Sequence, residues 1–479
     1  MSIITPIVLL AWLIFTFSPI LQSYGFCESY YNLTNEEERK LGTKFLHHVK
    51  RHLALVDNSI IINYITTVGK RIESQMPSQP FTYHFYVVKE DVYNAFAAPA
   101  GHVFINSGLL AAMDNEDELA GILAHEMAHV ACRHIAKRIE RSTKIGLATL
   151  AGVLAGIFLG GGGTATGAIT AGSIAAGESM ALKYSREDEA EADQVGLKYL
   201  TRAGYSAEGL LSMLKKIRMV RWFGPKEIPT YLTTHPAIEE RLAYIDTQMQ
   251  MHPGWGSPSR KIDPYEFTKI HMRLIALYGD MDTAQRRFQT LLDKEPENPL
   301  AYYGMALVLE KKGQREAAFN LFKKAILYNP TDPDILLDMG RSYFFAGNYR
   351  QAINVLKGAL AFRPQDREGH FLLGRSYLET GEFHEAIEAL NALVSLHPDF
   401  TEGYYYLGNA YDKIKNLGEA HYNLGLYFEL KGDTRNAGFH FKRALKLLEK
   451  DPARQESIQK KLKNLESDSR HDQSEKTSS

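Results

Sequence analysis

The chain has 479 residues, of which 45% are hydrophobic and 23% charged, and its formal net charge is -1. This composition is that of a globular protein with two or three domains and excludes a disordered or fibrous one. A near-neutral chain offers no surplus of basic residues for a phosphate backbone, so nucleic acid is not an expected partner. Two cysteines, Cys27 and Cys132, are too few for a disulfide framework.

The chain opens with an apolar segment. Residues 3–17 are almost wholly apolar, and the small residues Ser23 and Gly25 stand where a leader peptidase would cut. The sequence therefore predicts a signal peptide at residues 1–25 and export from the cytoplasm. Because residues 3–21 are nearly long enough to cross a bilayer and no Lys or Arg precedes them, an uncleaved N-terminal anchor is the alternative.

Residues 30–250 carry mixed helix and strand patterns. Thr34, followed by three glutamates, predicts a capped helix start with carboxylates at the positive end of the helix dipole. The runs 82–88 and 102–106 are rich in β-branched and aromatic residues and predict a small sheet. A long helix with apolar residues at helical spacing begins near Asp114. We therefore expect an α+β domain that is mostly helical.

An apolar stretch interrupts this domain at residues 143–183. Four consecutive glycines, Gly160 to Gly163, separate two arms of small or apolar residues. Each arm is short or weakly hydrophobic for a full membrane span, so we expect a helical hairpin packed over the domain. Insertion of this hairpin into a membrane is the alternative and would make the chain a membrane-integrated protein.

The pentapeptide His125-Glu126-Met127-Ala128-His129 lies on the expected long helix. Residues four apart share one face of a helix, so both imidazoles can bind one metal ion while Glu126 lies beside them. Two histidines and a glutamate among Ala, Leu and Val would be costly to bury without a ligand. A catalytic zinc ion needs a third protein ligand and one open position.

The third ligand must come from another segment, because Ile135 stands where one form of this pattern has a third histidine. Carboxylates recur in residues 185–193, and Glu189 with Asp193 fits best. If Glu189 binds the metal, Asp193 one turn later can accept the ring N–H of a ligand histidine. The alternative is that this acidic run is a solvated helix N-terminus favoured by the dipole.

For several residues near these motifs, the sequence pattern is less specific for one role. His235 is a candidate catalytic donor to the reacting carbonyl oxygen, with a helix cap or a reversible fourth metal ligand as alternatives. Cys132 is expected to be buried and inert rather than a metal ligand, and His134 to cap or pack at the end of its helix. Backbone pairing with an extended substrate is expected from the strand of Gly101, His102, Val103 and Phe104.

The second half of the chain is periodic. Prolines fall 34 residues apart at Pro296, Pro330, Pro364 and Pro398, and glycines and alanines repeat with the same period. This period, with Gly in the inter-helix turn and Ala where helices touch, is typical of tetratricopeptide repeats (TPRs). Residues 262–448 are therefore expected to form an all-α solenoid whose tyrosines build the core or line a peptide-binding groove. Residues 450–479, charged and Ser-rich, predict a disordered tail.

These motifs resemble a known metallopeptidase family. The segments 125–134, 185–193, 94–97 and 234–236 are similar to those of the family of HtpX, the CAAX prenyl proteases and BepA. With a signal peptide and C-terminal TPRs, the layout is most similar to BepA-like periplasmic proteases. One departure is that BepA-like proteins join protease and repeats through a cysteine pair, and the repeats of this chain contain no cysteine.

The resemblance implies a gluzincin-type fold and a site built around one Zn²⁺ ion per chain. Its ligands would be His125, His129 and Glu189, with Glu126 as the general base and Asp193 behind a ligand histidine. The zinc ion would activate a water molecule and polarise the scissile carbonyl while Glu126 moves the proton.

The expected function is therefore that of an ATP-independent zinc endopeptidase of the bacterial cell envelope. It would lie in the periplasm and degrade misfolded or stalled envelope and outer-membrane proteins. The TPRs would recruit these substrates or the outer-membrane assembly machinery, and a peripheral membrane contact is compatible with this picture. Two alternatives stay open: a chaperone or adaptor that acts through the TPRs with a latent protease site, and a membrane-integrated protease.

Overall fold

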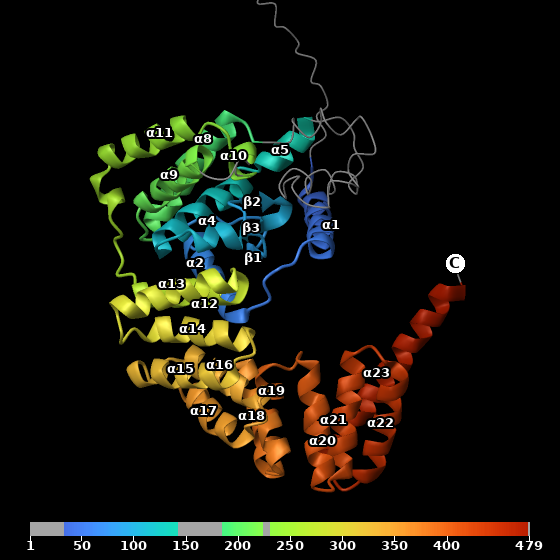
Figure 1. Cartoon of the computed structure of the whole chain (residues 1–479). Helices are drawn as coiled ribbons and strands as arrows, with labels where there is room; N and C mark the ends of the chain where they lie inside the picture. Colours follow the sequence, from blue (N-terminus) through green and yellow to red (C-terminus); the bar gives the residue numbers. More distant parts are fainter. Residues whose placement is uncertain (1–32, 142–183, 224–229, 478–479) are drawn as a thin grey trace, which may run out of the picture.

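The chain folds into a mixed α/β domain followed by a curved stack of helices (Figure 1). The computed structural model describes residues 33–141, 184–223 and 230–477. The signal peptide expected at residues 1–25 and the hairpin expected at 143–183 lie outside these residues. Among the helices that the structure describes, none combines the length and the apolarity needed to cross a membrane.

Two capped helices open the domain, α1 (Asn35–His52) and α2 (Ser59–Glu73). The Thr34 hydroxyl accepts the backbone N–H of Glu37, while the Glu37 carboxylate accepts the N–H of Thr34. This reciprocal cap satisfies two backbone donors that no helical carbonyl can reach. It confirms the helix start predicted from Thr34 and the three glutamates.

Three short strands form one sheet in the order β1-β3-β2, namely β1 (His84–Val88), β2 (Ala95–Ala98) and β3 (His102–Asn106). Strand β3 pairs in parallel with β1 and antiparallel with β2, so its backbone has a partner on both sides. Strands β1 and β2 lie at the two edges of the sheet; Val88 at the end of β1 makes an isolated bridge with Leu55, and no other described strand pairs with the outer side of β2.

The sheet order overturns one expectation about the substrate. The segment Gly101, His102, Val103 and Phe104 was predicted to pair with an extended substrate, but its backbone belongs to the centre of the sheet and to the 3₁₀ turn η1 (Pro99–Gly101). A sequence pattern predicts which residues form strands, but it does not predict which strand lies at the edge of the sheet. The edges of the sheet are formed by β1 and β2.

Helix α4 (Glu116–Ala131) runs through the centre of the domain and is buried on all sides. Its apolar residues Leu119, Ile122, Leu123 and Met127 pack into the main core. Helices α8 (Arg186–Arg202) and α9 (Glu208–Phe223) lie against it. The remaining elements of the domain are α3 (Ser107–Ala111), α5 (His134–Arg141), α10 (Thr230–Thr234), α11 (Ile238–Met251) and η3 (Pro253–Gly256).

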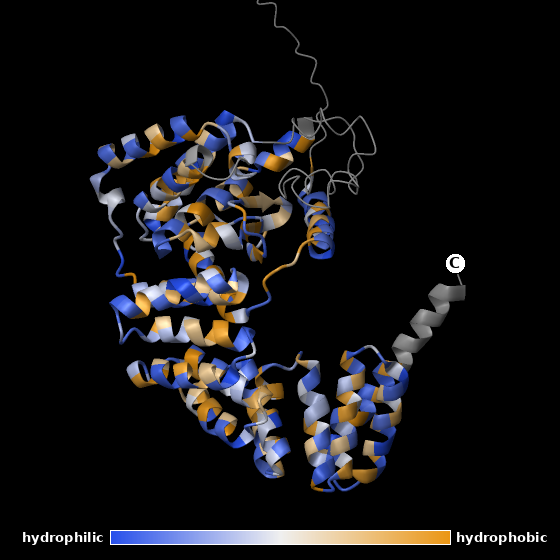
Figure 2. Ribbon diagram, viewed as in Figure 1, coloured by the Kyte–Doolittle hydropathy of each residue, from blue (hydrophilic) through white to orange (hydrophobic). Residues whose placement is uncertain are grey.

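The stack consists of consecutive helix pairs, as the 34-residue period predicts, and hydrophobic and hydrophilic residues share each helix (Figure 2). The predicted fold class, an α+β peptidase-type domain followed by a TPR solenoid, is confirmed. The helices are α12 (Pro264–Tyr278), α13 (Met281–Lys294), α14 (Pro299–Lys311), α15 (Arg315–Tyr328), α16 (Pro333–Phe345), α17 (Tyr349–Phe362), α18 (Arg367–Thr380), α19 (Phe383–Leu396), α20 (Thr401–Lys413), α21 (Leu417–Leu430), α22 (Thr434–Leu447) and α23 (Pro452–Thr477).

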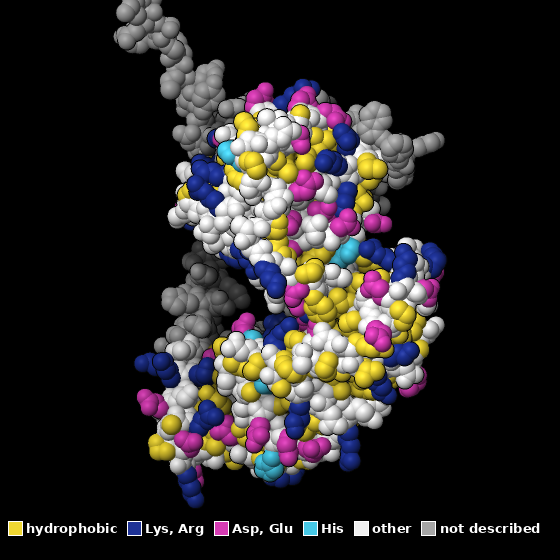
Figure 3. Space-filling view, turned by 90° about the vertical axis from the view of Figure 1, so that its left-hand side faces the viewer, with side chains coloured by type: hydrophobic (Ala, Val, Ile, Leu, Met, Phe, Trp, Pro, Cys, Tyr) yellow, Lys and Arg dark blue, Asp and Glu magenta, His cyan; other side chains and the backbone are white. Residues whose placement is uncertain are grey.

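Helix α12 joins the stack to the first domain. Arg273 donates from Nε to the Asn58 carboxamide oxygen that caps α2, at 2.9 Å, and it also pairs with the buried Asp338 of α16. His271 Nε2 lies 2.8 Å from the carbonyl oxygen of Ala111. Because these groups are buried, the junction is specific rather than a loose linker. On the face drawn in Figure 3, basic and acidic side chains are mixed over both parts of the molecule.

The C-terminal segment differs from the disordered tail predicted for residues 450–479. Helix α23 extends from Pro452 to Thr477, and Ile458 is fully buried beside Tyr422 and Phe441. Leu462 continues this contact one turn later. The physical reason is that the last repeat exposes an apolar face that a terminal helix must cover, and a few apolar residues at helical spacing suffice.

Two glycines provide a matched test of the packing around α4. A Cβ atom at Gly121 would lie 2.6 Å from the backbone nitrogen of Leu210 on α9, whereas one at Gly438 in α22 meets nothing within 4 Å. Gly121→Ala should lower the free energy of unfolding by about 1 to 3 kcal/mol through overpacking. Gly438→Ala should raise it by up to about 1 kcal/mol through helix propensity. Thermal unfolding of the two variants checks the pair, and a Gly121→Ala protein as stable as the wild type would contradict the close α4–α9 crossing.

Candidate active site

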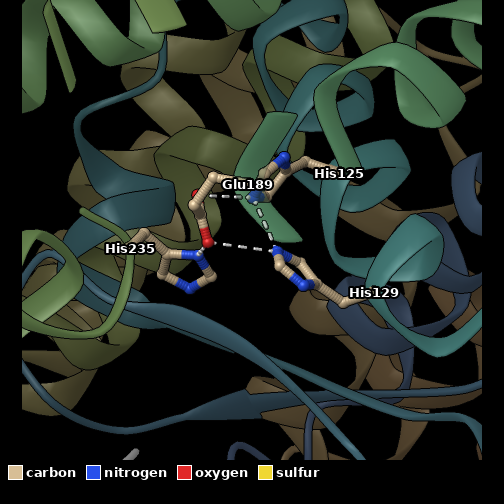
Figure 4. A group of neighbouring side chains, drawn as sticks. All are labelled: His125, His129, Glu189 and His235. Atoms are coloured by element: carbon tan, nitrogen blue, oxygen red, sulfur yellow. Dashed lines mark hydrogen bonds and ion pairs between the residues drawn. The ribbon is translucent and has the colours of Figure 1, made fainter. Parts of the chain in front are cut away.

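The residues of the H-E-x-x-H pentapeptide lie in the last two turns of α4, at the centre of the domain. His125 and His129 point to the same side of the helix, and their Nε2 atoms are 3.0 Å apart (Figure 4). Both side chains and Glu126 are buried. The four-residue spacing therefore has the geometric effect that the sequence predicts.

Glu189 reaches both histidines from α8. Its carboxylate oxygens lie 3.4 Å from His125 Nε2 and 3.4 Å from His129 Nε2. The Ser185 hydroxyl caps α8 by accepting the N–H of Asp188, which fixes the start of the helix one turn before Glu189. The acidic run is thus a helix N-terminus, and Glu189 is the member of its first turn that is buried in the site.

Asp193 lies one turn further along α8 and contacts His125 from behind. Its Oδ1 is 2.8 Å from His125 Nδ1. Arg241 of α11 donates from Nε and Nη2 to the two oxygens of Asp193, each at 2.8 Å, and its Nη1 lies 2.7 Å from Glu189 Oε2. The arrangement gives Asp193 the place that the sequence predicts and adds an arginine that the sequence did not reveal.

The pKa values of these groups follow from burial and from the charges nearby. Burial lowers the pKa of His125, but its contacts with Asp193 and Glu189 outweigh this and raise it to about 9. Burial alone would raise the pKa of Glu189, yet His235 and Arg241 hold it well below its usual range. Burial also lowers the pKa of His129 well below that of a free histidine. An ionised Glu189 beside a neutral His129 is the state that binds a cation.

His235 lies on the opposite side of Glu189, at the end of α10. Its Nδ1 is 3.0 Å from Glu189 Oε1, and its Nε2 is 3.3 Å from the carbonyl oxygen of Ala95 and 3.6 Å from Glu126 Oε1. Within the described residues, neither carboxylate oxygen of Glu126 has a hydrogen-bond partner. Burial raises the pKa of Glu126.

This group of residues fits a zinc ion. Ligand atoms of His125, His129, Glu189 and His235 all lie within 4.8 Å of one another, and imidazole nitrogens with a carboxylate oxygen are a donor set of zinc. A fully buried carboxylate without a hydrogen-bond donor, as at Glu126, is costly in an apolar interior. A divalent cation in the centre would remove much of that cost.

The edge of the sheet lies beside the group. Tyr184 donates its hydroxyl hydrogen to the carbonyl oxygen of Ala97, and its ring stacks on His129 with centroids 3.7 Å apart. Since the carbonyl oxygen of Ala95 contacts His235, the outward side of β2 faces the site. Tyr184 and Arg241 belong to no motif, and the sequence offers no signal that would have identified them.

A buried H-E-x-x-H helix with a carboxylate from a second helix, ahead of a TPR stack, defines a metallopeptidase domain joined to a repeat scaffold. Residues 63–249 match the model of Peptidase family M48, and residues 279–334, 337–399 and 371–420 match that of the Tetratricopeptide repeat. The first domain is therefore similar to peptidase family M48, and the second is similar to tetratricopeptide repeats.

The chain is also similar to curated proteases. The chain is 30% identical over 305 residues to the Beta-barrel assembly-enhancing protease of Yersinia pestis, a match that covers 62% of this chain and 61% of the relative. It is 27% identical over 347 residues to the protein of the same name in Escherichia coli strain K12, covering 65% of this chain and 70% of the relative. The first match therefore spans less than two thirds of that relative's length. Among solved structures, the chain is similar to one described as Crystal structure of MamA, with a TM-score of 0.32, 24% identity and coverage of 34% of this chain and 94% of the other.

The ligand set can be tested by metal content. His125→Ala and Glu189→Ala should each reduce the bound zinc from one ion per chain to a small fraction, because each removes a donor atom from a three-ligand set. Glu126→Gln should keep the ion, since its carboxylate lies beside the donors, and Glu187→Ala on the exposed face of α8 is the control. Elemental analysis of the dialysed proteins measures this. Loss of zinc in the histidine variant with full zinc in Glu189→Ala would refute Glu189 as a ligand.

Proposed function

We propose that this chain is a zinc-dependent endopeptidase of the bacterial cell envelope that degrades misfolded or stalled envelope and outer-membrane proteins in the periplasm. The observation that carries the proposal is the approach of His125, His129 and Glu189 to one point, with the buried carboxylate of Glu126 nearby, which accepts no hydrogen bond from the described residues. The name of two relatives, Beta-barrel assembly-enhancing protease, supports a link to the assembly of β-barrel proteins.

Each buried residue has a proposed role. When bound, zinc supplies a Lewis acid that polarises the scissile carbonyl and lowers the pKa of water. Glu126 is the general base, because its oxygens accept no hydrogen bond from the described residues and burial raises its pKa. It takes the proton from the attacking water and delivers it to the leaving amine. Asp193 and Arg241 hold the ring of His125 in one orientation.

The outward edge of β2 is the proposed substrate site. Carbonyl oxygens of Ala95 and Ala97 point to the site, as their contacts with His235 and Tyr184 indicate. An extended polypeptide added to this edge would be held by its backbone, which makes little demand on its sequence. Such binding suits unfolded proteins. The TPR stack is proposed to recruit them or an assembly partner, and its exposed apolar residues Leu327, Phe345 and Phe362 are candidates for that contact.

His235 is proposed to close the site as a reversible fourth ligand. With its Nε2 hydrogen directed at the carbonyl oxygen of Ala95, the Nδ1 lone pair faces the space between Glu189 and the two ligand histidines. A bound substrate needs that coordination position. His235 must therefore move aside before cleavage. The other role of His235, as a donor to the reacting carbonyl oxygen, predicts the opposite effect of its removal.

Replacement of the base tests the proposed reaction. Glu126→Gln should retain zinc and lower the rate of cleavage of an unfolded outer-membrane protein by about 100- to 10,000-fold, the range of general acid–base catalysis. The wild-type rate should fall as the pH drops through the raised pKa of Glu126, because a protonated carboxyl group cannot accept the proton of water. Cleavage is measured by gel electrophoresis and mass spectrometry, with Glu187→Gln as the matched surface control.

The same variant separates the peptidase from the adaptor hypothesis. If Glu126→Gln preserves the cellular function, and the function disappears only when the repeats are deleted as well, the chain acts through its TPRs. If neither the wild type nor His235→Ala cleaves an unfolded substrate although both hold zinc, the peptidase proposal itself is contradicted.

Removal of His235 tests the closure. His235→Ala should keep zinc on the three remaining ligands and cleave an unfolded substrate several-fold faster than the wild type, since the open position is then available without displacement of a side chain. Thr233→Ala, an exposed change two residues earlier, is the control. The initial rate at saturating substrate is the measurement. A fall in kcat at unchanged zinc content would instead assign His235 the donor role.

A further inference from the structure

We propose that His134, backed by Glu191, is the residue that positions the ligand His129, and that a left-handed turn held by Glu38 aims His134 at it. The inference rests on the proposed zinc site and concerns metal binding rather than cleavage. His134 lies outside the H-E-x-x-H pentapeptide and outside the group of four donors.

Contacts on the two sides of His129 differ. Its Nε2 faces the site, 3.4 Å from Glu189 Oε1 and 3.0 Å from His125 Nε2. Its Nδ1 faces away from the site and lies 2.9 Å from His134 Nδ1. His134 Nε2 in turn lies 3.1 Å from Glu191 Oε2. A continuous chain of short contacts therefore runs from the proposed ligand through a buried imidazole to a carboxylate.

This chain fixes the positions of the ring protons. If His129 binds a metal through Nε2, its Nδ1 carries the proton and donates it to a hydrogen bond. His134 Nδ1 then accepts, which leaves the His134 proton on Nε2, where Glu191 accepts it. Each contact thus has one direction, and both rings are held in one tautomer. The His134 side chain is buried, whereas the Glu191 side chain is 49% exposed, so the charge at the end of the chain is solvated.

The two proposed ligand histidines are therefore held differently. His125 contacts the buried Asp193 directly, and Arg241 balances that carboxylate. His129 contacts a neutral ring, and the carboxylate behind it is in solvent. Both arrangements orient a ligand, but the second keeps a further negative charge out of the buried centre, where an unbalanced charge would be costly.

An unusual backbone conformation places His134. Arg133, just before it, is left-handed with φ of 55°, a conformation that L-residues other than Gly, Asn and Asp rarely adopt. The turn lets the chain double back between α4 and α5, so that His134 returns to His129. Arg133 donates from Nη2 to the carbonyl oxygen of Leu33 at 2.8 Å and to Glu38 Oε2 at 2.9 Å.

Glu38 connects this turn to the substrate strand. Its carboxylate is 3% exposed, and its other oxygen accepts the N–H of Ala100 at 3.4 Å. Ala100 is also left-handed, with φ of 64°, and lies in the turn after β2. One buried carboxylate on α1 therefore holds the two turns that follow the metal-binding helix and the substrate edge.

A second metal ion is the competing explanation for this cluster. Ligand atoms of Cys132, His134 and Glu191 lie within 4.8 Å of one another. The direct contacts between the two histidines and Glu191 favour the positioning role.

Two measurements on the full chain test the proposal. One is zinc affinity, measured by competition with a fluorescent chelator, and the other is the visible spectrum of the cobalt-substituted protein. His134→Leu should weaken zinc binding about 10- to 100-fold and alter the cobalt spectrum, because His129 loses its acceptor. His134→Asn should restore most of the affinity, since its carboxamide oxygen can replace Nδ1. Glu191→Gln should stay near the wild type, because an amide oxygen still accepts from His134. Glu187→Ala is the control for loss of a charge on α8.

The turn is tested by a double-mutant cycle. Glu38→Ala should also weaken zinc binding, and the double variant Glu38→Ala/His134→Leu should be no weaker than His134→Leu alone, because both act through one contact. Additive losses would refute the role of Glu38. Wild-type affinity and an unchanged cobalt spectrum in His134→Leu would overturn the proposal. A second zinc ion in the wild type that disappears in Cys132→Ser would overturn it as well, in favour of a metal site. These measurements need no peptidase activity, so they fail independently of the proposed function.

Discussion

Charge balance at the centre of the first domain is the constraint on which the rest of the site depends. Glu126, Glu189 and Asp193 are fully buried in the site, and Arg241 forms ion pairs with Glu189 and Asp193. Contacts with Asp193 and Glu189 raise the pKa of His125 and so add a second positive charge, but burial of an incompletely compensated carboxylate is still expensive. A bound divalent cation would supply the remaining compensation, and we expect folding and metal binding to be coupled.

The close crossing of α4 and α8 makes this balance geometrically possible. A Cβ atom at Gly196 would lie 3.1 Å from the carbonyl oxygen of Ala124 and 3.3 Å from the Cα of His125, so a side chain here would push the helices apart. Glu189 lies two turns before Gly196 on the same helix. With the helix axes this close, its short side chain reaches both histidines at once.

The parts of the structure that the sequence predicts are those encoded by local spacing. The 34-residue period specifies the repeats, the four-residue spacing of His125 and His129 specifies one helix face, and the same spacing in Glu189 and Asp193 specifies another. A helix turns by a fixed angle per residue, so these patterns need no knowledge of the rest of the chain.

Contacts between distant elements are what the sequence does not encode locally. The order of the strands, which puts β3 in the centre and moves the proposed substrate edge to β2, depends on pairing between segments. Arg241, Glu38 and Tyr184 act through partners more than 45 residues away in the chain and stand in no motif. The helical tail depends on three apolar residues, Ile458, Leu462 and Leu465, that matter because the last repeat has an open face. The prediction of disorder used the average composition of residues 450–479, and an average does not reveal a few apolar residues at helical spacing.

The residues that hold the proposed metal ligands in place form two groups, on two sides of the site. This division determines which side can move when a closed site opens. His129 is held by His134, α5 and α1, next to the substrate edge, whereas His125 and Glu189 are held by Arg241 on α11. His235 and Arg241 flank Ala237, which is left-handed with φ of 65° and begins α11. Rotation of the backbone before Ala237 would withdraw His235 and leave Arg241 on Asp193. The proposed opening would then free one coordination position while both ligand histidines keep their supports, so the metal would stay bound as the substrate enters.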